Sequence, residues 1–118
     1  MSGELMFPKP GKKKKRKRHK KSVLHEKDGI CYLCMMKGIN RIHRYTEEHH
    51  IYRGANRAIS EENGFKCYLC PDHHRNGPEA VHNNMHNMRL LQKECQRVYE
   101  ETHTREEFME LIGRNYLD

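Results

Sequence analysis

Cysteines at metal-binding spacing stand out from the rest of the chain. Cys31 and Cys34 form one Cys-x-x-Cys pair, and Cys67 and Cys70 form another. Such a turn places two sulfurs on one side of an ion, and a second pair closes a tetrahedral zinc site. In the reducing cytosol such pairs hold metal more often than they form disulfides. We therefore predict a structural Zn²⁺ that holds the fold together.

The second pair of zinc ligands has two alternatives. One pair is Cys67 and Cys70. The other is Cys70 and His73, which have the same spacing and leave Cys67 as a small apolar residue in a strand. The spacing alone does not decide between them. Cys95 lies alone in a helical pattern and is predicted to be a small buried side chain.

Histidines could form a second, reactive site. Hydrolysis of a phosphodiester needs a base for the water and a cation for the charge that develops on the phosphate. Adjacent histidines on a strand point to opposite faces, so His49 and His50 need a bend or bulge to reach one site. The other candidates are His73, His74 and His82. The remaining histidines have no partner pattern and are predicted to lie on the surface: His19, His25, His43, His86 and His103.

Two strands and two helices are expected to position these residues. Residues 28–34 read as a turn, residues 44–52 as a short strand, residues 53–64 as a loop and residues 65–70 as a second strand. A helical pattern starts near residue 80, and its apolar face is Met85, Met88, Leu91, Cys95 and Val98. A last helix is predicted for about 104–113, with a capping box from Thr104 to Glu107 and an end at Gly113. Its buried stripe is Phe108, Leu111 and Ile112.

Composition limits the size and class of the protein. A chain of 118 residues allows one domain, and a hydrophobic content of 35% without tryptophan gives a small core that needs a metal to support it. No stretch approaches the ~20 apolar residues of a membrane span, and no secretory signal follows the N-terminal charges. We therefore expect a cytosolic protein that has no membrane partner.

The net charge of +7 is concentrated at one end of the chain. Ten of the 23 lysines and arginines lie between Lys9 and Lys21, a segment without acidic residues. Such a run stays solvated and can bind phosphates without sequence specificity. We predict a disordered basic arm over residues 1–22, followed by one domain over residues 23–118 whose core spans about 29–100. A solubilising tail is the alternative for the arm.

The order of these motifs resembles the HNH nuclease superfamily, whose fold is called ββα-metal. The resemblance covers roughly residues 29–82 and the helix that follows, and it extends to small HNH-like proteins of bacteriophages and prophages. Those proteins carry a Cys-x-x-Cys pair, Glu-His-His, a Gly-rich loop with Asn-Arg, a Leu-Cys-x-x-His-His knuckle and a Gly-Pro-Glu-Ala-Val-His stretch. Here the motifs lie at residues 31–34, 48–50, 53–57, 69–74 and 77–82.

The resemblance implies a small α+β domain of the zinc-bound ββα-metal class, with additional C-terminal helices. It favours Cys31, Cys34, Cys70 and His73 as the ligands of the structural zinc. The extra Cys67 departs from the family pattern, which keeps the pair Cys67 and Cys70 open.

The resemblance also implies a metal-dependent endonuclease that hydrolyses phosphodiester bonds in DNA, or alternatively in RNA. His50 would be the general base, oriented by Asn56 in the loop. His49, His74 and His82 would hold a catalytic divalent cation, which could be Mg²⁺, Mn²⁺, Ni²⁺ or Zn²⁺. In-line attack by water would leave a 5′-phosphate and a 3′-hydroxyl.

Basic side chains are the predicted contacts to nucleic acid. Arg53, Arg57 and Arg75 lie near the histidines in the sequence. The arm adds Lys12, Lys13, Lys14, Lys15, Arg16, Lys17 and Arg18. The resemblance places the protein in the cytoplasm of a bacterial host. The alternative function is a non-catalytic, zinc-stabilised nucleic-acid-binding phage protein, used in recombination or packaging.

Overall fold

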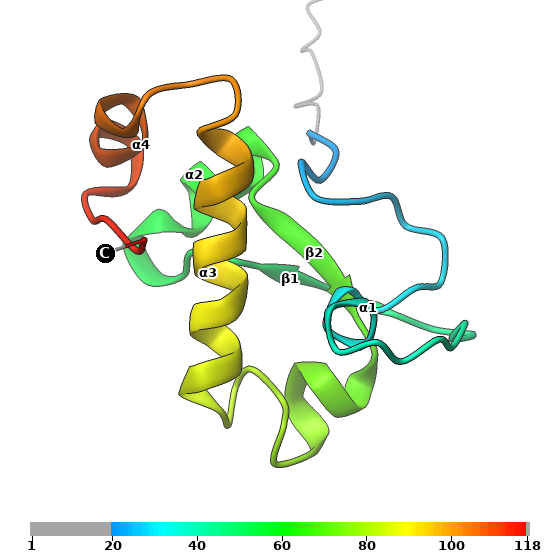
Figure 1. The fold of residues 1–118 in the computed structure, drawn as a ribbon. Coiled ribbons are helices and arrows are strands. Elements are labelled where there is room, and N and C mark those ends of the chain that lie inside the picture. Colours follow the sequence, from blue (N-terminus) through cyan, green and yellow to red (C-terminus); the bar gives the residue numbers. More distant parts are fainter. Residues whose placement is uncertain (1–19, 118) are drawn as a thin grey trace, which may run out of the picture.

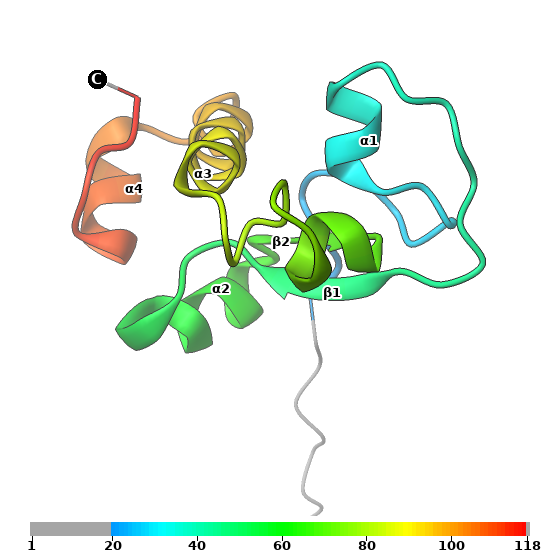
Figure 2. The same cartoon turned by 90° about the horizontal axis from the view of Figure 1, so that it is seen from below.

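A two-stranded antiparallel sheet lies at the centre of the domain, with helices packed around it (Figures 1 and 2). The structure is a computed structural model that describes residues 20–117. The predicted phosphate-binding positions Lys12, Lys13, Lys14, Lys15, Arg16, Lys17 and Arg18 lie outside the described residues. No helix within the described range is long and apolar enough to cross a membrane.

The sheet pairs β1 (Glu47–His50) with β2 (Lys66–Leu69), which confirms both predicted strands. In this register His49 lies opposite Cys67, and His50 lies opposite Lys66. Side chains alternate along a strand, so Glu47 and His49 share one face of the sheet while Glu48 and His50 share the other. No bulge interrupts the pairing of these four residues. The bend or bulge that was expected to bring His49 and His50 to one site is therefore absent from this strand.

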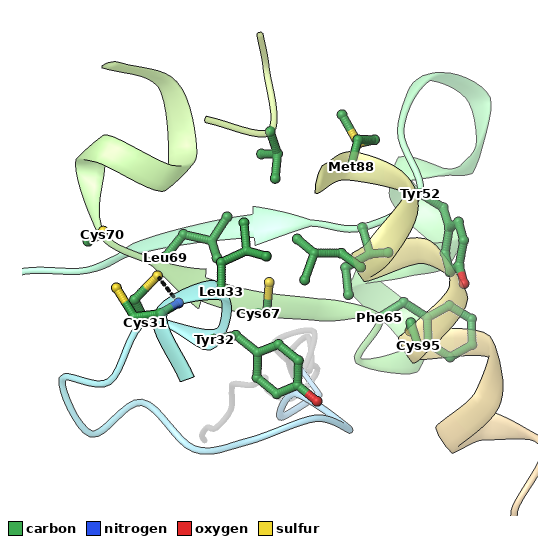
Figure 3. Close-up of a cluster of buried hydrophobic side chains, with 14 of the residues drawn as sticks. Cys31, Tyr32, Leu33, Tyr52, Phe65, Cys67, Leu69, Cys70, Met88 and Cys95 are labelled. Atoms are coloured by element: carbon green, nitrogen blue, oxygen red, sulfur yellow. Dashed lines mark hydrogen bonds between the residues drawn. The ribbon is translucent and has the colours of Figure 1, made fainter. Parts of the chain in front are cut away.

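The apolar core lies between the sheet, α1 (Tyr32–Met36) and α3 (Met85–Tyr99). Leu33 of α1, Leu69 of β2 and Leu91 of α3 are fully buried. Figure 3 shows Leu33 and Leu69 among the core side chains. Cys67 and Cys95 lie in the same core, which confirms the prediction of a buried Cys95. The short helix α1 replaces the predicted turn after residue 30, because the Cys31 sulfur accepts a hydrogen bond from the backbone N–H of Cys34 and caps the helix.

The two C-terminal helices begin at side-chain caps. Asn84 caps α3 by accepting from the backbone N–H of Asn87. Thr104 and Glu107 form the predicted capping box of α4 (Arg105–Ile112), and Gly113 ends the helix in the left-handed region. Met85 was expected in the core but is 64% exposed, because it lies in the first turn of α3, before the helix reaches the sheet.

A short helix occupies the segment that was predicted to be a loop. Residues Gly54–Asn56 form a 3₁₀ turn, η2, and Arg57–Asn63 form α2. The loop prediction gave weight to the Gly, Asn and Ser residues of this segment. The structure instead uses Gly64, at φ 75°, as the left-handed end of α2, and the residues before it include good helix formers. The prediction of a loop over 53–64 was therefore wrong.

The segment before α1 follows the free edge of β2. Val23 donates its backbone N–H to the Gly64 carbonyl. The His25 ring accepts a hydrogen bond from the backbone N–H of Tyr68 through Nε2, at 3.0 Å. His25 was predicted to lie on the surface, but it is half-buried here because its ring satisfies a donor on the edge of the sheet.

Candidate metal centres

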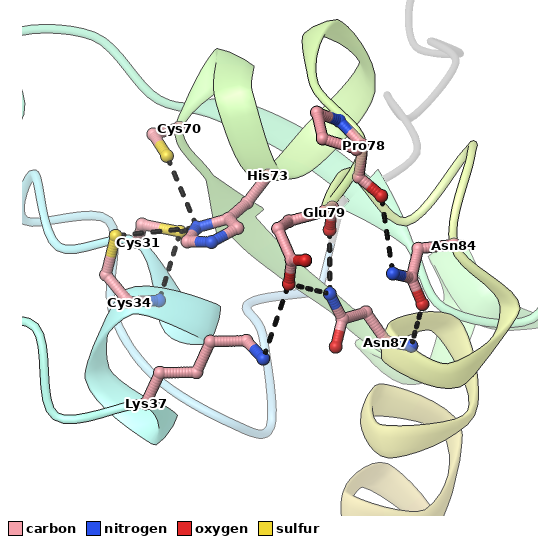
Figure 4. Close-up of polar contacts among 9 residues, drawn as sticks. All are labelled: Cys31, Cys34, Lys37, Cys70, His73, Pro78, Glu79, Asn84 and Asn87. Carbon is pink, nitrogen blue, oxygen red and sulfur yellow. Dashed lines mark hydrogen bonds and ion pairs between the residues drawn. The ribbon is translucent and has the colours of Figure 1, made fainter.

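A cluster of three cysteines and one histidine lies beside the sheet. Its four members are buried, and one potential ligand atom from each lies within 4.8 Å of all the others. The cluster joins α1 to the single π-helical turn η3 (Asp72–Asn76) that follows β2. Its members are Cys31, Cys34, Cys70 and His73 (Figure 4).

The distances within this cluster fit a tetrahedral zinc ion. His73 Nδ1 lies 3.4 Å from the Cys31 sulfur and 3.5 Å from the sulfurs of both Cys34 and Cys70. With zinc bonds of about 2.3 Å to sulfur and 2.0–2.1 Å to nitrogen, a tetrahedron has sulfur–nitrogen edges of roughly 3.6 Å. The nitrogen is therefore about equally distant from the three sulfurs, as a shared central ion requires. The cluster could hold a structural metal such as zinc.

The thiols must lose their protons to bind a divalent cation. Burial, together with the neighbouring Cys31 and Cys70, raises the pKa of Cys34 to about 12. Burial also raises the pKa of Cys70. Without a cation these sulfurs would therefore stay protonated at neutral pH, and a bound metal would deprotonate them and neutralise their charge.

Of the two alternative pairs for the second half of the site, the cluster contains Cys70 and His73 and leaves out Cys67. Cys67 lies in the apolar core, fully buried, and burial raises its pKa well above the usual value. A residue that the sequence did not indicate approaches the cluster instead. His43, predicted to be an ordinary surface residue, places Nε2 3.5 Å from the Cys34 sulfur. It can donate a hydrogen bond to that sulfur, as groups around zinc ligands often do.

Polar contacts connect Lys37, the residue after α1, to the start of α3 through Glu79 (Figure 4). The Glu79 carboxylate lies 3.8 Å from the ammonium of Lys37, just after α1, and accepts a hydrogen bond from the Asn87 amide. Asn84 donates its side-chain amide to the Pro78 carbonyl. The segment between η3 and α3, which carries His82, is thereby held against the end of α1 and the start of α3.

A second cluster consists of His49, His74 and His82. His49 comes from β1, His74 from η3 and His82 from the turn before α3. The Nε2 atoms of His74 and His82 are 3.2 Å apart. The His49 ring lies 5.4 Å from the His74 ring and 5.6 Å from the His82 ring, between centroids. The three imidazoles that the sequence predicted to share a cation therefore meet.

The Nε2 atom of His49 is the clearest indication of a ligand. It is fully buried, and it has no hydrogen-bond partner among residues 20–117. A buried polar atom without a partner is costly and needs a reason, such as an ion. Burial, with the neighbouring His74 and His82, lowers the pKa of His49 to about 3. The ring is therefore neutral at physiological pH, which is the state that binds metal.

Glu47 fixes the orientation of His74. Its Oε1 lies 2.6 Å from Nδ1 of His74, and this hydrogen bond is the main reason why the pKa of Glu47 is lowered. Because a carboxylate only accepts, the proton lies on Nδ1 and Nε2 keeps its lone pair. A carboxylate behind an imidazole is the usual support for a metal ligand.

His82 is the most exposed of the three imidazoles. It is exposed, and its Nδ1 lies 3.3 Å from the guanidinium of Arg53. Because arginine only donates, Nδ1 of His82 acts as the acceptor and the proton lies on Nε2, facing His74. To hold a cation through Nε2, His82 would have to carry its proton on Nδ1 instead, and the contact of Nδ1 with the Arg53 donor would then be lost.

A cavity of about 260 Å³ opens next to this cluster. Three arginines stand on its wall, and Glu48 is the only carboxylate among the described residues that line it. Arg53 contacts His82, as above, and Arg75 lies 3.8 Å from Glu47. The cavity is lined by Glu48, His49, His50, Arg53, Arg57, His74, Arg75 and His82. The three guanidinium groups on its wall suit the cavity to an anionic group such as phosphate.

His50 borders the same cavity but belongs to a third group of side chains. Its Nε2 lies 2.6 Å from Oε1 of Glu61 and 3.6 Å from Oε2 of Glu48. The buried Lys66 places its ammonium 3.1 Å from Glu48 and 3.5 Å from Glu61. Burial alone would lower the pKa of Lys66, but the hydrogen bond and charge of Glu48, with the charge of Glu61, raise it. The ammonium is therefore charged.

Asn56 does not join His50. Its amide donates to the carbonyl of Ile112 at the end of α4, at 3.0 Å, and Asn56 is not among the described residues that line the cavity. Glu61 and Lys66 were not predicted as partners of His50. The register of the two strands could have suggested Lys66, whereas Glu61 depends on the helix α2 that was predicted to be a loop.

No known protein family, curated protein or solved structure matches this chain. The geometry of the clusters and of the cavity is therefore the guide to function.

Proposed function

We propose that the protein is a metal-dependent endonuclease of the HNH type, with a structural zinc at the cysteine cluster and a catalytic divalent cation at His49, His74 and His82. The observation that carries the proposal is the buried, unpartnered Nε2 of His49, which lies beside two other imidazoles at the wall of an open cavity. A purely structural site would leave no room for a substrate, whereas a catalytic site needs an open side.

The side chains around the cavity can divide the work of phosphodiester hydrolysis. His50 is the proposed general base that takes a proton from water. When bound, the cation would neutralise the charge that develops on the phosphate and on the leaving 3′ oxygen. Arg53, Arg57 and Arg75 would hold the phosphate, since guanidinium groups match phosphate oxygens well. The products would carry a 5′-phosphate and a 3′-hydroxyl.

DNA is the proposed substrate. The basic run between Lys9 and Lys21 would add affinity for phosphates without sequence preference. The segment that follows this run lies against β2, which connects the run to the catalytic domain. The proposal places the protein in the cytoplasm of a bacterium, encoded by a phage or prophage.

A plasmid-nicking assay with Mn²⁺, Ni²⁺, Mg²⁺ or Zn²⁺ tests this function. We expect His50→Ala to lower the nicking rate about 100-fold or more, as the loss of a general base does. His50→Ala should still bind the cation, whereas His49→Ala should lose cation binding as well as nicking. His86→Ala is the matched control, because His86 is exposed on α3 and lies outside the cavity lining.

Equal nicking rates for the wild type and His50→Ala would remove the catalytic role of His50. If no variant cleaves but the wild type binds DNA with a strong salt dependence, the alternative function applies. The protein would then be a non-catalytic, zinc-stabilised accessory protein that binds nucleic acid, for recombination or packaging.

A further inference from the structure

Three charged side chains surround His50 on the face of the sheet opposite His49, or at its edge. His50 and Glu48 extend from β1, Lys66 from β2 and Glu61 from α2. The shortest contact is the 2.6 Å between His50 Nε2 and Glu61 Oε1. The side chains of His50 and Lys66 are only 13% and 5% exposed, so these contacts are shielded from water.

This group has the composition of a metal site, since Glu48, His50 and Glu61 could together hold an ion. Lys66 argues against that reading. Its ammonium lies within 3.5 Å of both carboxylates and supplies the positive charge that they need. A divalent ion there would face a buried positive charge at close range, which is unfavourable. The group is therefore suited to holding His50 and not to holding an ion.

Glu61 determines which nitrogen of His50 can act as a base. The carboxylate accepts a hydrogen bond from Nε2, so in the neutral ring the proton lies on Nε2 and the lone pair on Nδ1. The same contact limits rotation of the imidazole. A carboxylate behind a catalytic histidine serves both purposes in other hydrolases, where it acts through the histidine and does not touch the substrate.

We propose that Glu61, held in place by the buried ammonium of Lys66, is the positioning residue that orients His50 for proton abstraction. This inference rests on the proposed nuclease function. It gives Glu61 the role of orienting the base, which the family resemblance gave to Asn56. Asn56 instead ties η2 to the end of α4 through the Ile112 carbonyl. Glu61 is not one of the described residues on the cavity wall, so it acts through His50 alone.

The ring tautomer of His50 tests the inference without any nuclease activity. Long-range ¹H–¹⁵N spectra of the full, zinc-loaded chain should show the wild-type ring protonated at Nε2. Glu61→Ala should give a mixture of the two tautomers. Glu61→Gln keeps a side-chain oxygen that can accept, so it should restore much of the wild-type ratio, and it serves as a second variant if Glu61→Ala folds poorly.

Nicking kinetics in Mn²⁺ provide the second measurement. Glu61→Ala should lower kcat about 10–100-fold and change KM less than about threefold, because the substrate does not touch Glu61. Glu61→Gln should fall between Glu61→Ala and the wild type. Cation binding at the three histidines should match the wild type in both variants.

Asn56→Ala is the matched control, since Asn56 is the residue that would otherwise orient the base. It should keep the Nε2-protonated ring and lower Tm, because α4 loses its contact with η2. If Asn56→Ala changes the tautomer and kcat while Glu61→Ala changes neither, the inference is overturned. A wild type that never cleaves would remove the proposed function, yet the tautomer would still decide whether Glu61 orients His50.

Discussion

The cysteine cluster and the three-histidine cluster use similar residues in opposite ways. The cysteine cluster has four buried potential ligands, and each sulfur lies at a distance from His73 Nδ1 that fits a tetrahedral ion. The histidine cluster has three members, one of them exposed, and it borders a cavity. A closed set of four ligands leaves no position for a substrate, whereas an open set of three does.

This difference suits the cysteine cluster to a structural ion and the histidine cluster to the proposed catalytic cation. The cysteine cluster connects α1 to η3 across a small apolar core. The histidine cluster connects elements that the sheet and the cysteine cluster already hold in place. Losing a ligand should therefore unfold the domain at the first cluster and only weaken cation binding at the second.

The largest expected effect is the loss of the zinc. Chelation, or the substitution Cys70→Ser, should abolish the helical circular dichroism signal at 25 °C, because a structural zinc supplies folding free energy that a small core cannot replace. Zinc content measured on the same samples checks the cause. A helical signal that persists after the zinc is shown to be gone would contradict this role of the cluster.

Cys67→Ala is the matched control for this substitution. Cys67 is buried in the core, outside the cluster, so its replacement should cost about 1 kcal/mol of unfolding free energy and leave one zinc per chain. If Cys67→Ala lost the zinc and Cys70→Ser kept it, the ligand set would be wrong.

A smaller effect is expected for Glu47, which supports His74 of the histidine cluster. Glu47→Gln removes the carboxylate that fixes His74, and it should weaken divalent cation binding about 10–100-fold while the fold and the zinc remain. Titration calorimetry with Mn²⁺ on the zinc-loaded chain measures this. Glu62→Gln makes the same change on the exposed surface of α2 and should leave the affinity as it is in the wild type. Unfolding of Glu47→Gln would remove the distinction between the two clusters.

The smallest effect concerns His25, a histidine that belongs to neither cluster. Burial lowers its pKa below the usual 6.5, so the folded state resists protonation. The stability that His25 contributes is therefore present above about pH 6.5 and is lost as the pH falls, when Nε2 can no longer accept from Tyr68. The hydrogen bond is worth about 1 kcal/mol. The amide shift of Tyr68 should follow this titration, and in His25→Phe it should not.

Much of the fold could be predicted because the signals are local. The two strands alternate, and the last helix has both a capping box and a terminal glycine, so β1, β2 and α4 were expected near their observed bounds. The helix α2 was missed because its residues compete between loop and helix, and packing decides the outcome. Ser60, for example, is fully buried and bonds the backbone of Tyr52.

The candidate sites were predictable to the extent that spacing in the sequence fixes proximity. Cys31 with Cys34, and Cys70 with His73, follow from two short turns. Glu61 and His43 did not follow, because their partners lie 11 and 9 residues away and are reached only once α2 and the loop after α1 are folded. The pairing of His50 with Glu61, and not with Asn56, is thus a consequence of tertiary packing.

His73 and His74 are neighbours in the chain, yet each points into a different cluster. A single peptide unit, about 3.8 Å between α-carbons, therefore connects the cysteine cluster to the histidine cluster. Under the proposed function this arrangement would act as an interlock in a cell: a newly made chain that had not acquired zinc would not assemble the three imidazoles. Cleavage would then begin only on molecules that have finished folding, and metal starvation would silence the protein without any inhibitor.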